Sequence, residues 1–270
     1  MIEEICRVKK EYPVSSIHFS DDLFFHPDHR YEFFRLLDLY RDSVNIRFTC
    51  NIRPDFITQD LAGALKGANC KAVAMSVESG CPRIRNEVLS KKINDEQIIQ
   101  AAGILHKNRI KVMTFNIMAF PSEGIEDIYK TIDFNNSFRP QYSRIITLFP
   151  ICNSDLYKFA VSNDMLKDDP FNKVTDISRE LYNAAFYKGN KAEYANIFFL
   201  FPIAVKLRLS SGLLKILVRL PFFHIYKLFF VIVSNLNEKQ FFGIGLFSGL
   251  RYFLHTRGVS RRSENLTSIY

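Results

Sequence analysis

The sequence has 270 residues and a formal net charge of +8, with 47% hydrophobic and 24% charged residues. This composition excludes a wholly disordered chain and a fibrous repeat. Five scattered cysteines do not make a disulfide framework, and the acidic start at Met1–Glu4 is unlike a signal peptide. We therefore expect a cytoplasmic globular protein with one large domain, or one domain and an appendage.

Positive charge and phenylalanine are concentrated towards the C-terminus. Residues 196–262 hold ten Lys or Arg, one acidic residue and 11 of the 26 Phe, so this segment carries +9 and the remainder about −1. The contrast predicts four parts: a body over residues 1–165, a linker over 166–193, a basic, aromatic-rich helical extension over 194–257 and a flexible tail over 258–270.

The body alternates strand-like and helix-like segments. Short runs rich in Val, Ile, Phe and Thr predict strands at residues 14–20, 45–50, 70–77, 110–118 and 142–149. Helical spacing of apolar residues predicts helices at 29–41, 58–68, 94–107, 124–135 and 154–160, the third capped by Asn94. Such alternation favours an α/β fold with parallel strands and right-handed crossovers. Periodicity alone leaves a doubly wound sheet and a barrel open.

Polar side chains gather where the predicted strands end. They are Asp21 and Asp22 after the first strand, Asn51 and Arg53 after the second, Glu78 and Ser79 after the third, and Asn116 near the end of the fourth. In parallel α/β folds ligands bind at this edge of the sheet. The carboxylates and the arginine suit a zwitterionic ligand or a metal ion. The alternative is that the carboxylates only cap the helices and loops that follow.

Five segments, in this order and with these gaps, resemble the radical S-adenosylmethionine superfamily, in the branch whose full-length members carry an N-terminal cobalamin-binding domain. They are Ile17-x-Phe19-Ser20-Asp21-Asp22-Leu23-Phe24, Cys50-Asn51-Ile52-Arg53-Pro54-Asp55, Leu65-Lys66-x-Ala68-x-Cys70 leading into Val77-Glu78-Ser79-Gly80, Phe120-Pro121-Ser122-Glu123, and Phe149-Pro150-Ile151-Cys152-Asn153-Ser154-Asp155-Leu156-Tyr157. The resemblance covers about residues 1–165. It implies a partial (βα) barrel in which the five strands are the second to the sixth, and residues 1–11 form the helix after a first strand that this sequence lacks.

The resemblance also implies a cofactor, S-adenosylmethionine, and roles for the residues at the strand ends. Asp21 and Asp22 correspond to residues that receive the amino group of the cofactor. Glu78, with Ser79 beside it, corresponds to a contact to the ribose or the methionine portion. Arg53 is placed to approach the carboxylate, which suits its planar pair of donors. The segment 116–120, which begins with Asn116, would flank the adenine.

Other features of the family have no counterpart in this sequence. Its Cys-x-x-x-Cys-x-x-Cys loop, which holds three irons of a [4Fe-4S] cluster, is absent, because Cys6, Cys50, Cys70, Cys81 and Cys152 lack that spacing. The cobalamin-binding domain and its Asp-x-His-x-x-Gly motif are absent too, and two glycines expected within residues 119–123 are substituted. We therefore expect no metal ligands and name no catalytic residue.

Two interpretations of the function follow. The first is a C-terminal fragment or degenerate member of a radical enzyme whose intact relatives cleave S-adenosylmethionine reductively, to modify or methylate a substrate. The second is a non-catalytic pseudoenzyme or membrane-surface adaptor that uses the barrel as a scaffold. The substrate, a small or lipid-like molecule in the first case, cannot be deduced from the residues.

The basic segment suggests a surface rather than a membrane span. Its longest uncharged runs have 12, 10 and 11 residues, fewer than the roughly 18 needed to span a bilayer. We expect Arg208, Lys215 and Arg219 on one helical face, up to a break at Pro221. Either this face is solvated while the helix packs on the barrel, or residues 194–262 lie on an anionic membrane surface. Nucleic-acid binding is not favoured, because no recognition motif accompanies the charge.

Overall fold

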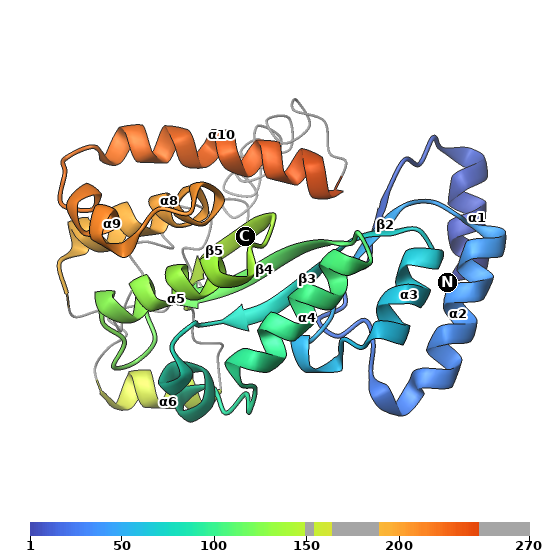
Figure 1. Ribbon diagram of the computed structural model, residues 1–270, viewed down its shortest axis with the longest axis horizontal. Helices are drawn as coiled ribbons and strands as arrows, with labels where there is room; N and C mark the ends of the chain where they lie inside the picture. Colours follow the sequence, from blue (N-terminus) through green and yellow to red (C-terminus); the bar gives the residue numbers. More distant parts are fainter. Residues whose placement is uncertain (149–153, 164–188, 243–270) are drawn as a thin grey trace, which may run out of the picture.

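The computed structural model describes residues 1–148, 154–163 and 189–242 (Figure 1). Most of the expected linker, residues 166–188, and the expected tail, residues 258–270, lie outside the described residues. Residues 149–153 of the last quoted segment and residues 243–257 of the expected extension lie outside them as well.

Five parallel strands form one sheet in which spatial order follows chain order. The strands are β1 (Ile17–His18), β2 (Phe48–Asn51), β3 (Cys70–Glu78), β4 (Lys111–Met118) and β5 (Tyr142–Thr147). The sheet curls into a half-barrel (Figure 1). This confirms the predicted α/β fold and the partial barrel. β1 is shorter than predicted, with two residues paired to β2.

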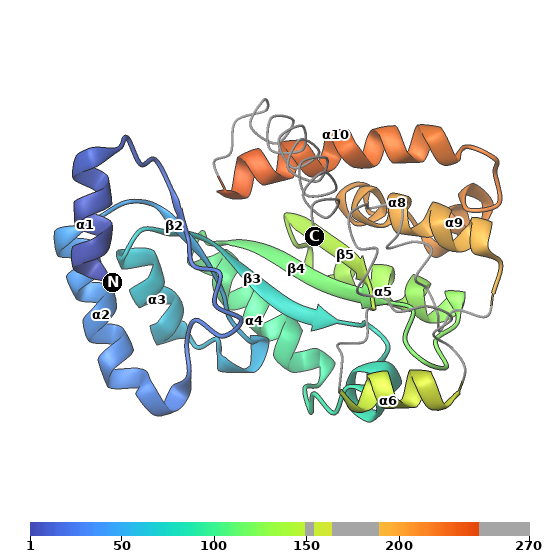
Figure 2. The ribbon, with the colours of Figure 1, turned by 180° about the vertical axis from the view of Figure 1, so that it is seen from behind.

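Six helices accompany these strands: α1 (Ile2–Glu11), α2 (Arg30–Ser43), α3 (Gln59–Gly67), α4 (Asp95–Lys107), α5 (Ile125–Phe138) and α6 (Asp155–Ser162). Each lies within a few residues of its predicted range. Asn94 caps α4 through a reciprocal pair of hydrogen bonds with Gln97, 2.8 and 2.9 Å long. Figure 2 shows α1 alongside α2 at the N-terminal end of the sheet.

The two faces of the sheet have separate cores, because successive side chains of a strand point to opposite sides. On β3, Val73, Met75 and Val77 belong to the core shared with α2, α3 and α4. Ala72 and Ala74 face the other way and pack with Met113, Tyr142 and Phe241. The small alanines leave room for this phenylalanine, which comes from the C-terminal part of the chain.

Three further helices form the C-terminal layer: α8 (Lys191–Leu207), α9 (Ser211–Leu217) and α10 (Phe223–Phe242). α8 packs on β5 and α5, and α10 packs on α8 as the outermost helix (Figure 1). Up to residue 242 the extension is therefore helical, as predicted. Searched over the described residues, the layer includes no helix long and apolar enough to cross a membrane.

The prediction that Arg208, Lys215 and Arg219 share one helical face is wrong. α8 ends at Leu207, and the next residue, Arg208, has a φ of 54° in the left-handed region. Lys215 lies in α9, and Arg219 lies beyond the end of that helix. Two of the three are also in ion pairs, Lys215 with Glu126 at 2.9 Å and Arg219 with Glu193 at 3.7 Å.

Candidate functional site

Two ion pairs lie at the edge where β2 and β3 end. Beyond β2, Arg53 donates through Nε and Nη2 to the two carboxylate oxygens of Asp55, at 3.1 and 3.0 Å. At the end of β3, Glu78 accepts a 2.7 Å hydrogen bond from Lys91, which also donates to the carbonyl of Ser76. The structure therefore brings two predicted residues, Arg53 and Glu78, to one edge, each with a partner already.

The two pairs act on each other electrostatically. Burial lowers the pKa of Lys91, the positive charge of Arg53 lowers it further, and Glu78 and Asp55 oppose both effects. Glu78 has a φ of 64°, and the register of β3 against β4 shifts at this point. This irregular strand end turns the Glu78 side chain towards Lys91.

Asn51, the last residue of β2, ties the loop after β1 to this edge. Its Nδ2 donates to the carbonyl of Asp21 at 3.0 Å, and its own carbonyl accepts from the amide of Phe24. Its Oδ1 is buried without a hydrogen-bond partner among the described residues. Asp21 and Asp22 are both exposed in the loop that this hydrogen bond holds. The sequence places Asn51 with Arg53 at the end of the second predicted strand, but it assigns no role to Asn51.

Ser79 and Gly80 hold a helix in place rather than facing the edge. Ser79 is fully buried, and its hydroxyl lies 3.3 Å from that of Thr131 in α5 and accepts from the amide of Cys81. The Gly80 amide also donates to Thr131, at 2.9 Å. A Cβ on Gly80 would lie 2.6 Å from the Thr131 Cα and 2.7 Å from the Phe134 Cβ. Glycine is required here because α5 passes so close.

The Asn116 side chain points to the helix side of the sheet, towards α5, although Asn116 is the register partner of Glu78 on the neighbouring strand. It is 1% exposed, donates to the Arg144 carbonyl at 3.1 Å and accepts from Asn135 of α5 at 2.9 Å. Thr114 and Ser143 both donate to the Asn135 Oδ1. The side chain is thus fully engaged in a buried polar network, and it does not join the candidate site.

The turn after β4 is held by a buried carboxylate. Glu123 accepts from the amides of Ala119 and Phe120, at 2.5 and 3.2 Å. Burial raises the pKa of Glu123 to about 8, against the opposing effect of those two amides. Ala119 and Ser122 have φ values of 70° and 64°, a region that favours glycine. This agrees with the two glycines that the family resemblance implies in this segment.

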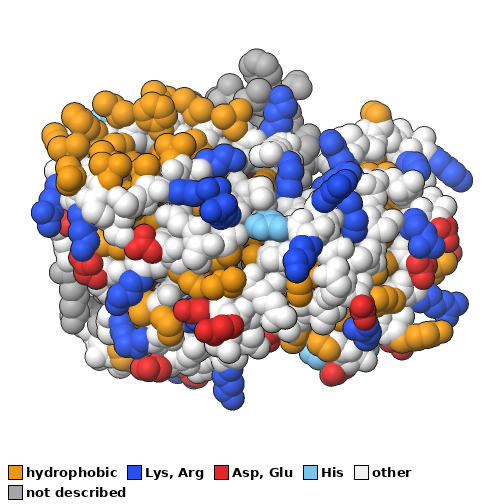
Figure 3. All heavy atoms as spheres, viewed as in Figure 1, with side chains coloured by type: hydrophobic (Ala, Val, Ile, Leu, Met, Phe, Trp, Pro, Cys, Tyr) orange, Lys and Arg blue, Asp and Glu red, His pale blue; other side chains and the backbone are white. Residues whose placement is uncertain are grey.

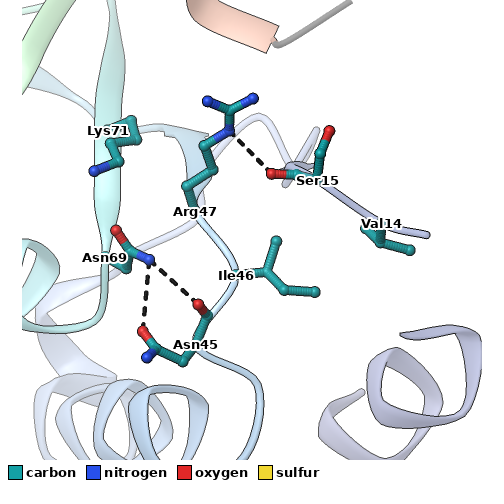
Figure 4. A pocket seen from close by; sticks show the side chains of 7 residues that line it. All are labelled: Val14, Ser15, Asn45, Ile46, Arg47, Asn69 and Lys71. Atoms are coloured by element: carbon teal, nitrogen blue, oxygen red, sulfur yellow. Dashed lines mark hydrogen bonds between the residues drawn. The ribbon is translucent and has the colours of Figure 1, made fainter. Parts of the chain in front are cut away.

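A separate hollow of about 530 Å³ lies at the opposite end of the strands, where β2 and β3 begin (Figure 4). It is lined by Val14, Ser15, Asn45, Ile46, Arg47, Asn69 and Lys71. Arg47 donates to the Ser15 carbonyl, and Asn69 donates to the carbonyl and side chain of Asn45. These bonds join the starts of neighbouring strands, and the hollow is wide open to solvent.

The four described cysteines do not fit an iron–sulfur cluster. Cys50 and Cys70 are buried on neighbouring strands in the core beneath α3 and α4. Cys81 lies 3.4 Å from Asp127, and Cys6 is on α1. Over residues 1–148, 154–163 and 189–242, no three Cys, His, Asp or Glu side chains are close enough to hold a metal ion.

Comparisons with known proteins found a matching family model and a curated relative. Residues 1–134 match the family model described as the radical SAM superfamily. An uncharacterized methyltransferase from Pyrococcus horikoshii is 28% identical over 177 residues, which are 66% of this chain and 38% of the relative. The chain thus spans well under half of that relative's length.

Two solved structures are similar at low identity. One is the radical S-adenosylmethionine methyltransferase TsrM from Kitasatospora setae with cobalamin and a [4Fe-4S] cluster bound, at a TM-score of 0.47 and 13% identity over 54% of this chain and 30% of that one. The other is the radical SAM enzyme coproporphyrinogen III oxidase from Escherichia coli, at a TM-score of 0.47 and 14% identity over 73% and 43%.

Proposed function

This chain belongs to the radical S-adenosylmethionine superfamily, whose family model matches residues 1–134, and we propose that it binds S-adenosylmethionine where β1, β2 and β3 end. The ligand's α-amino and α-carboxylate groups carry opposite charges, and its sulfonium is a further positive charge. The edge offers both kinds of partner: the exposed carboxylates of Asp21 and Asp22, and the guanidinium of Arg53.

The observation that carries this proposal is the Oδ1 of Asn51, which is buried and has no hydrogen-bond partner among the residues that the structure describes. A buried acceptor without a partner costs about 1–3 kcal/mol, so buried polar groups are rarely left in this condition. An ammonium group supplies the donor that Asn51 lacks. The neighbouring carboxylates of Asp21 and Asp22 would attract the same positive charge.

Arg53 and Glu78 have complementary parts in this proposal. The Nη1 of Arg53 takes no part in the pair with Asp55, so it remains available to a carboxylate. Glu78 is held by Lys91 through one oxygen, Oε1, and its other oxygen can accept from a ribose hydroxyl. Asp55 and Lys91 position the two side chains, which reduces the conformational entropy lost on binding.

The relative from Pyrococcus horikoshii is named a methyltransferase, and we propose methyl transfer from S-adenosylmethionine as the reaction of the whole protein. The described cysteines do not fit a cluster, so the part assigned to the described residues is to bind and orient the ligand. The same cysteine placement favours a second candidate, a non-catalytic protein that binds S-adenosylmethionine on a barrel scaffold.

Titration calorimetry of the full chain with S-adenosylmethionine tests the proposed site. Asn51→Ala removes the acceptor and should weaken binding about tenfold or more, since a hydrogen bond to a charged group contributes about 1.5–3 kcal/mol. Asn163→Ala is the matched control, because Asn163 is exposed and, among the described residues, its side chain bonds only within its own helix end. No binding by the wild type, or equal binding by Asn51→Ala, would contradict the proposal.

Anaerobic reconstitution with iron and sulfide separates the two candidates. The full chain is then assayed for bound iron and for 5′-deoxyadenosine after reduction. The radical enzyme predicts both, whereas the scaffold predicts ligand binding with neither iron nor 5′-deoxyadenosine. The described cysteines favour the second result.

A further inference from the structure

The outer surface of α9 and α10 is apolar. Six large side chains on it are about half exposed, at 45–62%: Ile216, Ile225, Leu228, Phe229, Ile232 and Leu236. We call these six residues the apolar face. Figure 3 shows hydrophobic side chains gathered over this part of the molecule, at the upper left. Contiguous exposed apolar surface of this kind marks interaction sites in soluble proteins.

The apolar face is a helical stripe with no partner among the described residues. Ile225, Leu228, Ile232 and Leu236 are spaced by three or four residues, so they share one side of α10. The opposite side is used for packing, because Phe230 contacts the rings of Phe198 and Phe199 at 5.7 and 5.4 Å. Burial on α8 therefore accounts for the inner side only. An ordinary surface helix would have polar residues on the outer one.

The surroundings of the apolar face are basic. Residues 191–242 hold seven Lys or Arg and two acidic residues, Glu193 and Glu238, which gives a net charge of +5. Lys227 and Lys239 are exposed on α10 itself. Glu193 already neighbours Arg219. An occupant of this surface is therefore apolar where it meets the stripe and negatively charged around it.

We propose that α10 lies flat on an anionic lipid bilayer, with the apolar face at the boundary between headgroups and acyl chains. The helix has 20 residues and is about 30 Å long, and the lysines Lys227 and Lys239 lie at the level of the lipid phosphates. A second copy of this chain is a poorer occupant, because pairing the same surfaces brings two positively charged layers together. This inference is independent of the proposed S-adenosylmethionine site.

Flotation of the full chain with vesicles tests the proposal. Phosphatidylcholine vesicles with and without phosphatidylglycerol are compared at low and high salt. The wild type should float with the anionic vesicles. The fraction that floats should fall at high salt but should not reach zero, because the apolar contribution is insensitive to salt. Leu228→Gln, Phe229→Gln and Ile232→Gln together should lower the partition coefficient at least about tenfold at both salt concentrations.

Two matched variants separate the contributions. Leu39→Gln with Ile99→Gln removes two similarly exposed apolar side chains on α2 and α4, and flotation should be unchanged. Lys227→Gln with Lys239→Gln should weaken binding several-fold at low salt and match the wild type at high salt. Circular dichroism checks that each variant keeps its helices.

The absence of Trp provides a second readout that does not need a disruptive substitution. A single Trp at position 229, in Phe229→Trp, should shift its emission to the blue on adding anionic vesicles. Tyr31→Trp, on exposed α2, should not.

Three results would overturn the proposal. They are no flotation of the wild type at low salt, equal flotation of the apolar triple variant, and no emission shift at position 229. If light scattering shows a dimer that the triple variant abolishes while lipid is not bound, the occupant is a second copy of the chain.

Discussion

The edge of the half-barrel and the outer side of the C-terminal layer both face solvent, yet they are built in opposite ways. At the edge, charged side chains are held in pairs, Arg53 with Asp55 and Glu78 with Lys91, and one buried acceptor is left unpaired. On the layer, large apolar side chains are half exposed within a positively charged surround. The first arrangement suits a small polar ligand and the second an extended surface. A single chain therefore presents two surfaces with different chemistry.

A second comparison lies within the sheet, between Asn51 and Asn116. Both occur near strand ends, where Asn116 is fully buried and Asn51 is half-buried. Asn116 points to the helix side, where Asn135 and the Arg144 carbonyl satisfy it. Asn51 is at the edge and keeps a free Oδ1. Substitutions in the network around Asn116 should therefore lower stability, and substitution of Asn51 should weaken ligand binding.

The largest effect is expected in the buried network. Asn135→Ala removes the acceptor of Thr114 and Ser143 and the donor to Asn116, so it should lower the free energy of unfolding by about 2–4 kcal/mol. Urea denaturation measures this. Asn163→Ala, the exposed control, should change it by less than about 0.5 kcal/mol. Equal stability of the two variants would show that the network is not formed.

The next effect concerns Gly80. Gly80→Ala places a methyl group against the backbone of α5 and should cost about 1–3 kcal/mol. Gly103→Ala is the matched control, since no atom lies within 4 Å of the place that its Cβ would take, and alanine favours the interior of α4. It should stabilise the protein by up to about 1 kcal/mol. Thermal unfolding of both variants measures these effects. Equal changes in the Tm of Gly80→Ala and Gly103→Ala would contradict this account.

The smallest effect, taken per pH unit, is a pH dependence from Glu123. Its pKa is raised to about 8 in the folded protein from 4.5, so the folded state binds more protons than the unfolded state between those values. Stability from this group is complete below pH 4.5 and is lost as the pH rises through 8. The loss should be about 1 kcal/mol per pH unit near pH 6–7.

Glu123→Gln keeps an oxygen that can accept from the Ala119 and Phe120 amides but does not titrate. Denaturation of this variant and the wild type at pH 5, 6.5 and 8 isolates the contribution of the carboxyl group. Parallel pH profiles would mean that Glu123 is ionised throughout.

The order of elements in the half-barrel could be predicted from the sequence because its signals are local. Strand runs, helical spacing and the Asn94 cap depend on neighbouring residues. The side of the sheet on which Asn116 lies depends on register, and a shift of one residue reverses it. The requirement for glycine at position 80 depends on α5, about 50 residues further along the chain, so it has no local signal.

The candidate site could be predicted only in part, because the strand ends follow from local signals but the partners of their side chains do not. Parallel strands bring Arg53 and Glu78 to one edge whatever their partners. Lys91 is 13 residues from Glu78 and follows an irregular segment, so the pairing is set by the tertiary fold. In the C-terminal layer, the composition predicted helices, and the described residues form them. The chain turns at Arg208, however, where the spacing predicted a continuous helix. That turn separated residues whose spacing predicts a single face.

A crystal structure of the full chain with S-adenosylmethionine tests the central claim most directly. The account predicts ligand density where β1, β2 and β3 end, with the α-amino nitrogen within hydrogen-bond distance of the Asn51 Oδ1. Density in the hollow lined by Arg47 and Lys71 at the other end of the strands, or an edge left empty at saturating ligand, would contradict it.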